Sequence, residues 1–393
     1  MRERRSSDHG VPVWRDVRVI RVVVQVVFLA AIAAGLWWLL RNLRANLASS
    51  GLAFEFRFLR DTAGFPISEG IAYDPTRSNG YAFWVGVVNT LRVAGVGILG
   101  ATAIGTVVGV ARLSANWLVR RLATLYVETI RNIPLLVQIF FWYFAVILTA
   151  MPLVGDSIRL PGNIFLSRRG LCMPWPVATP SFTSWVGFLI GAAVAGIAVY
   201  CIRRRRLRRL DRPGLPMVWA ICTFAAVAFA GWWIVPGHPL VLEIPVLERF
   251  NFSGGLSLSA SFLALLIALS TYTGSFIAEI VRGGVQAVSR GQTEAARALG
   301  LRRLSVLRLV VLPQAMRIII PPLGSQYLNL IKNSSLAILI GYYDLMNVGT
   351  TIFNQTGRAV EMILLIMLSY LVMSLVTSSL INLYNRRMKL VER

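Results

Sequence analysis

The sequence is poor in the residues that carry most metal and acid–base chemistry. It has only two histidines and three cysteines in 393 residues. The cysteines, Cys172, Cys201 and Cys222, show no C-x-x-C pair and no other spacing typical of metal ligands. Because histidine and thiolate are the main zinc ligands, and histidine is the commonest general base, the sequence predicts no metal site, no bound cofactor and no catalytic residue. We therefore expect a protein that is not an enzyme.

Charged residues are also scarce, and those present are mostly of one sign. Only 15% of the residues are charged, with 40 Lys+Arg against 17 Asp+Glu. The basic residues lie between apolar blocks rather than on one amphipathic face, which argues against nucleic-acid binding. The two lysines, Lys332 and Lys389, do not follow glycine, so the Gly-x-x-x-x-Gly-Lys-[Ser/Thr] phosphate-binding loop is absent. The chain is not expected to bind ATP itself.

Apolar residues are abundant, at 56% of the chain, and the mean hydropathy is +0.65. They form blocks long enough to cross a hydrocarbon layer of about 30 Å as helices, which satisfy their own backbone hydrogen bonds. We therefore predict an all-α polytopic membrane protein with about eight transmembrane helices, with a kink or a broken entry at Pro321-Pro322 in the seventh. The predicted spans are Val17–Leu40, Trp84–Val110, Ile133–Leu153, Trp185–Ile202, Met217–Val235, Ala260–Val281, Leu312–Gly341 and Met362–Tyr384.

The positions of the basic residues predict the orientation. Most Lys and Arg fall in segments that share one side of the membrane when both termini lie in the cytoplasm. The run Arg203–Arg209 is the strongest of these signals, and we interpret it as a topology anchor in preference to a lipid or receptor site. On the other side, the alternation over Phe54–Phe58 fits either a short amphipathic segment at the interface or a short strand.

Small residues predict close helix packing in two of the spans. Gly105-x-x-x-Gly109 and Gly187-x-x-x-Gly191 have the spacing that lets helices approach each other in lipid.

The long loop between the sixth and seventh spans carries the most informative pattern. It contains Glu294-Ala295-Ala296, then Gly300, and further on Val310 and Leu312-Pro313. Helix-favouring residues over Gln292–Leu299 end at Gly300, a typical residue after a helix C-terminus. From the residues alone, a short helix that receives force from a cytosolic motor and an ordinary amphipathic connector are equally favoured.

This pattern resembles the EAA loop of ABC-importer permeases. The resemblance extends to segments typical of the histidine/glutamine branch and covers roughly residues 84–150 and 260–385. The whole chain, including the parts outside these two ranges, resembles the general L-amino-acid permeases. The segments are Asn89-Thr90-Leu91, residues 131–138 (RNIPLLVQ), residues 278–284 (AEIVRGG) and residues 332–336 (KNSSL).

The resemblance implies a division of the chain and a fold. Residues 1–83 would form a cytoplasmic tail, the first span and an outer interfacial segment. Residues 84–153 and 260–393 would form the two parts of a five-helix, MetI-like permease core, with the coupling loop at 289–313. Residues 154–259 would form an outer loop and two inserted spans.

The resemblance also implies a function and partners. The chain would be the permease subunit of an importer that carries amino acids across the bacterial inner membrane, and Glu294, Ala295, Ala296 and Gly300 would couple it to the ATPase. The protein partners would be a cytosolic ATPase dimer that binds the ATP, a second, related permease chain and a periplasmic amino-acid-binding protein. The lipid bilayer would surround the permease chains. An ion-coupled secondary transporter or a channel is the alternative.

Ionisable and polar residues in the spans complete the set of candidates. Glu128 with Arg131, and Glu279 with Arg282, have the i,i+3 spacing of local ion pairs, which we interpret as structural. A lysine within a span is a functional candidate by default, although it can instead extend to the interface. Asn333 stands where related permeases commonly have Asp, which predicts a relaxed charge preference. The candidates for the substrate path are Lys332, Asn333, Ser334, Gln138 and Tyr272.

Overall fold

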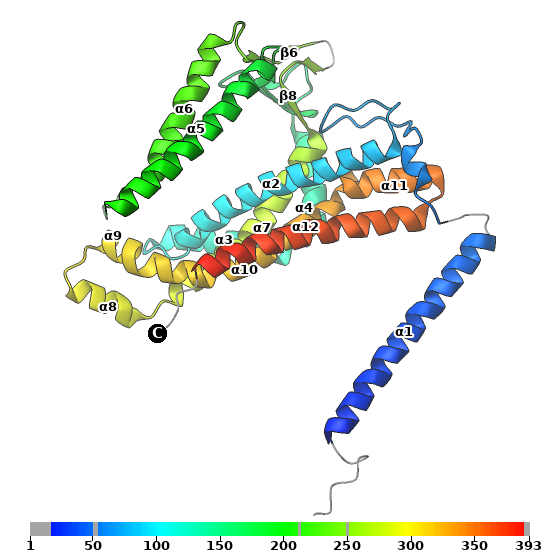
Figure 1. The fold of residues 1–393 in the computed structure, drawn as a ribbon, viewed down its shortest axis with the longest axis horizontal. Helices are drawn as coiled ribbons and strands as arrows, with labels where there is room; N and C mark the ends of the chain where they lie inside the picture. Colours follow the sequence, from blue (N-terminus) through cyan, green and yellow to red (C-terminus); the bar gives the residue numbers. More distant parts are fainter. Residues whose placement is uncertain (1–16, 50–53, 211–213, 249–250, 389–393) are drawn as a thin grey trace, which may run out of the picture.

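The computed structural model describes residues 17–49, 54–210, 214–248 and 251–388 (Figure 1). In this part of the chain, seven helices are long and apolar enough to cross a membrane, or eight if a bent pair counts as one span. The prediction of about eight spans is therefore confirmed. The α-helices are α1 (Val17–Ser49), α2 (Asn79–Ala111), α3 (Trp117–Asn132), α4 (Leu135–Phe140), α5 (Phe182–Arg209), α6 (Pro216–Ile234), α7 (Ala260–Gln286), α8 (Arg290–Ala298), α9 (Arg303–Val306), α10 (Leu312–Asn333), α11 (Leu345–Thr356) and α12 (Ala359–Met388).

Helices α2 and α7 pack at the centre of the core bundle. A Cβ atom on Gly105 would lie 2.5 Å from Cβ of Ile277, and one on Gly109 would lie 2.8 Å from the carbonyl oxygen of Ala278. These distances leave room only for glycine, so the predicted close approach through Gly105 and Gly109 is confirmed. The surrounding core includes Val93, Ala101, Leu265, Leu269 and Leu330.

The third predicted span is broken near its start. Helix α3 and the segment Leu135–Ala150, which joins α4 to the π-helical η3 (Phe141–Ala150), meet at 105°. Proline lacks an N–H and disfavours helical backbone in the preceding residue, and Ile133 is accordingly extended, with φ −96° and ψ 128°. The segment before Pro134 was predicted only as a cytoplasmic connection between the second and third spans. The structure shows that it forms a 16-residue amphipathic helix, α3.

The seventh span, by contrast, runs through Pro321-Pro322 as one helix, so the predicted break there is wrong, and a kink at the proline pair stays a prediction. A Cβ on Gly284 would lie 2.3 Å from Ile319 on one side of the proline pair, and a Cβ on Gly324 would lie 2.9 Å from Ile381 on the other. This packing by α7 and α12 supports the helix where backbone hydrogen bonds are lost. The irregular turns occur at the two ends of α10, in the π-helical η4 (Leu307–Val311) and the 3₁₀ helix η5 (Ser334–Ile340).

The segment 54–78 covers the end of α2 at which that helix begins. Phe54–Phe56 have no regular structure, and the next four residues form the 3₁₀ helix η2 (Arg57–Arg60). Phe58 is buried in a cluster with Phe65, Ile67 and Val85. The strand interpretation is wrong, because Phe54–Phe58 form no strand. Phe58 is packed inward, whereas Phe54 and Phe56 are 49% and 39% exposed, so the interfacial amphipathic segment stays a prediction.

Short strands, which the sequence analysis did not predict, build the region between the third span and α7. They form three antiparallel sheets with the orders β1-β2-β3-β8, β4-β5 and β6-β7. In the first sheet, Leu171 pairs with Leu258, so the sheet joins the chain before α5 directly to the start of α7. The strands are β1 (Ile158–Leu160), β2 (Ile164–Ser167), β3 (Gly170–Met173), β4 (Trp175–Ala178), β5 (Leu240–Glu243), β6 (Val246–Leu247), β7 (Phe252–Ser253) and β8 (Leu256–Ser259).

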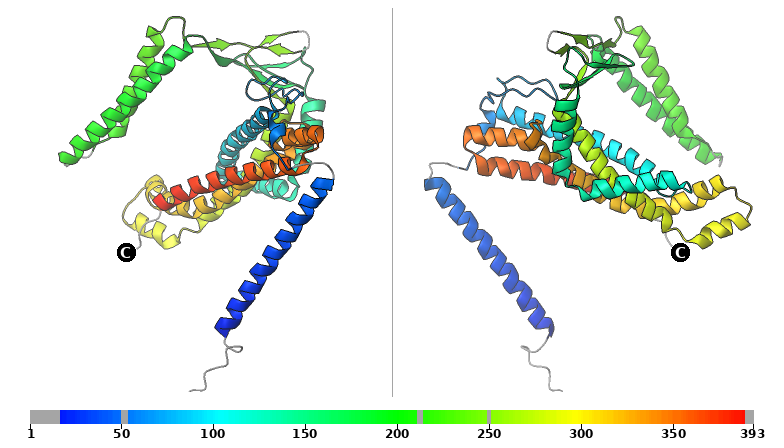
Figure 2. Two further views of the ribbon diagram at one scale, coloured as in Figure 1. Left: turned by 45° about the vertical axis from the view of Figure 1, so that its right-hand side comes forward. Right: turned by 180° about the vertical axis from the view of Figure 1, so that it is seen from behind.

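Helices α5 and α6 form a hairpin that projects away from the core, and α1 also stands apart (Figure 2). The predicted close approach at Gly187 and Gly191 is wrong, because no atom lies within 4 Å of a Cβ built at either position. The two helices instead approach at Gly196, whose Cβ would lie 3.1 Å from the carbonyl oxygen of Ala220. The indole Nε1 of Trp185 also donates a hydrogen bond to the carbonyl oxygen of Ala228 at 3.0 Å.

Candidate coupling site and substrate path

The predicted coupling residues lie on α8, a nine-residue helix at the opposite end of α7 from strand β8 (Figure 1). The predicted helix over Gln292–Leu299 is present and begins two residues earlier, at Arg290. Gly300 follows the helix with a left-handed φ of +79°. The N–H of Leu301 donates to the carbonyl oxygen of Ala296 at 3.2 Å, and the N–H of Gly300 to that of Arg297 at 2.9 Å. These paired bonds fix the direction in which the chain leaves α8.

The four predicted coupling residues have two different environments. Ala296 is 4% exposed and belongs to the same buried cluster as Val306 and Val311, so it attaches α8 to the turn that precedes α10. Glu294, Ala295 and Gly300 are exposed. In the described part of the chain, Glu294 forms no ion pair with Arg297 or with any other residue. The exposed face of α8 is therefore available for contact with another protein.

Two leucines beside this face were not singled out by the sequence analysis. Leu299 is 82% exposed and Leu304 is 76% exposed, although both follow or flank a well-defined turn. Large apolar side chains exposed next to a charged, small-residue helix are typical of an interaction surface. In the sequence, only their position on either side of Gly300 hinted that these leucines are exposed. Nothing else distinguished them from leucines of the core. We refer to Glu294, Ala295, Leu299 and Leu304 as the α8 surface.

Close to α8, an ion cluster joins α2 to α7. Glu279 forms ion pairs with Arg282 on its own helix and with Arg112, the residue that caps the end of α2. Arg282 also donates from Nη1 to Oε1 of Gln286 at 2.6 Å. One carboxylate thus stands between two guanidinium groups from two helices. The sequence spacing indicated the partner three residues away but not Arg112, which is far away in the chain.

The other predicted pair, Glu128 and Arg131, is not formed among the residues that the structure describes. The guanidinium of Arg131 instead lies over the ring of Phe276, 4.8 Å from its centroid. Glu128 is exposed. An i,i+3 spacing permits an ion pair but does not enforce one, and here the aromatic face on α7 provides an alternative partner for the cation.

The substrate-path candidates lie on helices that pack on one another, but the structure gives them different environments. Lys332 is exposed near the end of α10, and Asn333 is half-buried. Ser334 is fully buried and donates to the carbonyl oxygen of Ile331 at 2.8 Å. Tyr272 is half-buried on α7, and its ring centroid lies 5.0 Å from that of Phe276.

Gln138 has a structural task at the break of the third span. It is 5% exposed, and its Nε2 donates to the carbonyl oxygens of Ile130 and Ile133 at 2.9 and 3.0 Å. These are orphan carbonyls at the end of α3, so Gln138 stabilises the 105° bend. Within the described ranges, no hydrogen bond or ion pair links any two of the five substrate-path candidates. The same ranges contain no group of three or more His, Cys, Asp or Glu residues placed to hold a metal ion.

A family model described as "Binding-protein-dependent transport system inner membrane component" matches residues 192–390. The general L-amino acid transport system permease protein AapQ of Rhizobium johnstonii is 44% identical over 381 residues, covering 96% of this chain and 94% of AapQ. The putative amino-acid ABC transporter permease protein YhdX of Escherichia coli is 42% identical, and all of both chains is covered. A crystal structure of an amino acid ABC transporter with histidines is 22% identical, with a TM-score of 0.47, and covers 78% of this chain and 94% of that one.

The chain belongs to the family of binding-protein-dependent transport system inner membrane components. It is a multi-pass membrane permease of the ABC-transporter type, so the resemblance, the fold class and the predicted role as an ABC-transporter permease are confirmed. None of the relatives named above is an ion-coupled transporter, so that alternative gains no support.

Proposed function

We propose that this permease carries amino acids across the inner membrane and is driven by a separate ATPase that docks on the α8 surface. The single observation that carries the coupling proposal is the arrangement of α8. Its buried Ala296 attaches it to the start of the seventh span, while Glu294 and Ala295 remain exposed. A helix fixed to a span on one side and open on the other can pass a displacement to that span.

The chain has no phosphate-binding loop, so the proposal assigns ATP binding to a cytosolic ATPase dimer. The distribution of basic segments supports an orientation with α8 and both termini in the cytoplasm and the strands outside. A binding protein would then deliver the amino acid at the strand side. A second, related permease chain would complete the membrane unit. The two relatives named above as amino-acid permeases support this class of substrate.

Lys332, Asn333, Ser334 and Tyr272 remain our proposed lining of the substrate path, on α7 and at the junction of α10 with η5. Gln138 is better explained by its bonds at the bend of the third span. The neutral side chain of Asn333 supports transport of amino acids of more than one charge, because it presents no fixed charge to the substrate.

The test is co-purification of the permease with its ATPase, with ATP-driven uptake measured in reconstituted vesicles. Glu294→Lys reverses the charge of the α8 surface without filling a buried space, so we expect loss of ATPase binding and at least a tenfold fall in uptake. Glu243→Lys is the matched control, because it makes the same charge change on exposed strand β5. Retention of ATPase and uptake by the Glu294→Lys variant contradicts the coupling proposal. Uptake by the purified permease without ATP contradicts ATP-driven transport altogether.

A further inference from the structure

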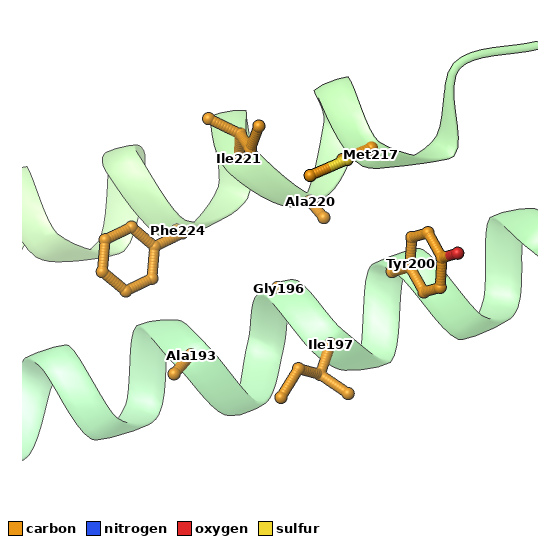
Figure 3. Close-up of a pocket in the computed structure, with 8 residues that line it drawn as sticks. All are labelled: Ala193, Gly196, Ile197, Tyr200, Met217, Ala220, Ile221 and Phe224. Atoms are coloured by element: carbon orange, nitrogen blue, oxygen red, sulfur yellow. The ribbon is translucent and has the colours of Figure 1, made fainter. Parts of the chain in front are cut away.

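The α5–α6 hairpin carries an apolar groove whose walls come from these two helices only (Figure 3). The helices approach closely at Gly196, where a side chain would meet the carbonyl oxygen of Ala220. Larger side chains on either side of this contact leave a depression along the hairpin. Ile197 is 64% exposed and Met217 is 66% exposed, so the apolar walls face outward. The lining residues are Ala193, Gly196, Ile197, Tyr200, Met217, Ala220, Ile221 and Phe224.

One end of the groove meets a cluster of arginines held by aromatic rings. The guanidinium carbon of Arg203 lies 3.9 Å from the ring centroid of Trp219, and that of Arg204 lies 5.8 Å from the ring of Tyr200, which lines the groove. A ring face orients a guanidinium group but uses none of its five N–H donors. Both arginines therefore keep donors for an anion at this end of the groove.

No acidic side chain of the hairpin neutralises these arginines. Seven of the ten residues 203–212 are arginines, whereas residues 182–210 and 214–234 contain no Asp or Glu. Asp211 is the one nearby acid in the sequence and lies outside the described residues. In the described part of the chain, every ion pair belongs to the core or to segment 54–78, and none to the hairpin. The counter-charge for the cluster must come largely from outside the hairpin.

The groove and the two ring-held arginines add a second role to the topology anchor predicted from the sequence. We propose that the hairpin binds an anionic phospholipid, with an acyl chain in the apolar groove and the headgroup phosphate at Arg203 and Arg204. Guanidinium groups bind phosphate through paired N–H donors, and basic pockets beside membrane helices recognise anionic headgroups. The groove has an outward-facing apolar wall that ends at the arginines. An acyl chain can pack on this wall, whereas a free phosphate ion would make no use of it. On the adjoining face of α5, Arg203 and Arg206 line a second depression with apolar neighbours, which extends the basic surface. This proposal does not depend on which solute the permease carries.

The test uses the emission of Trp219, which lies directly under Arg203. The full-length chain is placed in nanodiscs that contain equal fractions of brominated phosphatidylglycerol or brominated phosphatidylcholine, and Trp219→Phe protein gives the emission to subtract. We expect the anionic lipid to quench Trp219 at least twofold more strongly. The Arg203→Gln/Arg204→Gln variant should remove this difference.

The matched control is Arg205→Gln/Arg209→Gln. It removes the same charge from the same helix, but helical geometry places these residues on the side away from the groove. We expect it to keep the lipid preference. Equal quenching by both lipids in the unaltered protein overturns the proposal, and so does an equal loss in both double variants, which indicates only general attraction by charge. Circular dichroism of each variant confirms that the helices are intact.

Discussion

The core bundle and the α5–α6 hairpin are built from the same apolar and small residues, yet they bury them differently. In the core, Gly105 and Gly109 bring α2 against α7, and Leu265 and Leu269 are fully buried. In the hairpin, Gly187 and Gly191 face open space, and Ile190 is 62% exposed. Composition thus identifies a membrane helix, whereas its neighbours decide whether its small residues become contact points or lipid-facing surface.

The largest expected effect tests this contrast directly. Gly105→Leu would push a side chain into Ile277 and into the carbonyl oxygen of Gly274, which lies 2.9 Å from the Cβ position. Overpacking of this kind costs about 1–3 kcal/mol or more. We expect loss of most of the monodisperse protein on size-exclusion chromatography and loss of uptake. Gly187→Leu should leave both unchanged, and equal damage by the two substitutions would mean that the hairpin is as closely packed as the core.

A smaller effect is expected at the ion cluster of the core. Glu279→Gln leaves Arg112 and Arg282 facing each other without their shared carboxylate. Because Glu279 is about a third exposed, we expect a loss of only about 1–2 kcal/mol, measured as a lower melting temperature in detergent. Glu128→Gln is the matched control, since that carboxylate is exposed and forms no ion pair in the described part of the chain. Equal shifts for both variants would contradict a structural role for the cluster.

A pH dependence is also expected, and it comes from the core and not from the hairpin. Asp344, which lies outside the membrane-spanning helices, caps α11, and burial raises the pKa of its carboxyl group from 3.8 to about 7. The folded state therefore holds this proton more tightly than the unfolded state does. The resulting stability is present below pH 4 and is lost as the pH rises to 7, by at most about 1.4 kcal/mol per pH unit.

Asp344→Asn keeps a good helix cap and removes this titration. We expect melting temperatures of the variant to vary less between pH 5 and pH 8 than those of the unaltered protein. Glu243→Gln, an exposed carboxylate on strand β5, serves as the control and should keep the original slope. An unchanged slope in the Asp344→Asn protein would assign the pH dependence to another group.

The features that could be predicted from the sequence are those with local causes. Long apolar blocks define the spans, and helix-favouring residues before Gly300 define α8. The wrong predictions concern features that neighbours decide. Pro321-Pro322 stay helical because α7 and α12 pack on both sides, and Gly187 has no helix opposite it. The strands were missed because each has only two to four residues, too few for a periodic pattern.

The candidate site shows the same limit. The loop pattern located Glu294 and Ala295, but their separation from the buried Ala296 depends on how α8 packs against Val306 and Val311. Gln138 looked like a polar residue in a span, and only the bend at Pro134 reveals the two carbonyl groups that it satisfies. Arg112 was missed as a partner of Glu279 because the two are 167 residues apart.

The uninterrupted helical segment from Arg303 to Ile340 has a mechanical consequence. Its 38 residues make a rod of roughly 57 Å, well beyond the ~30 Å thickness of the hydrocarbon layer. Such a rod either leans in the bilayer or protrudes from it, and its helix is continuous through the proline pair. A small tilt imposed beside α8 would therefore move the far tip, η5, sideways by about twice the displacement of a rod half as long.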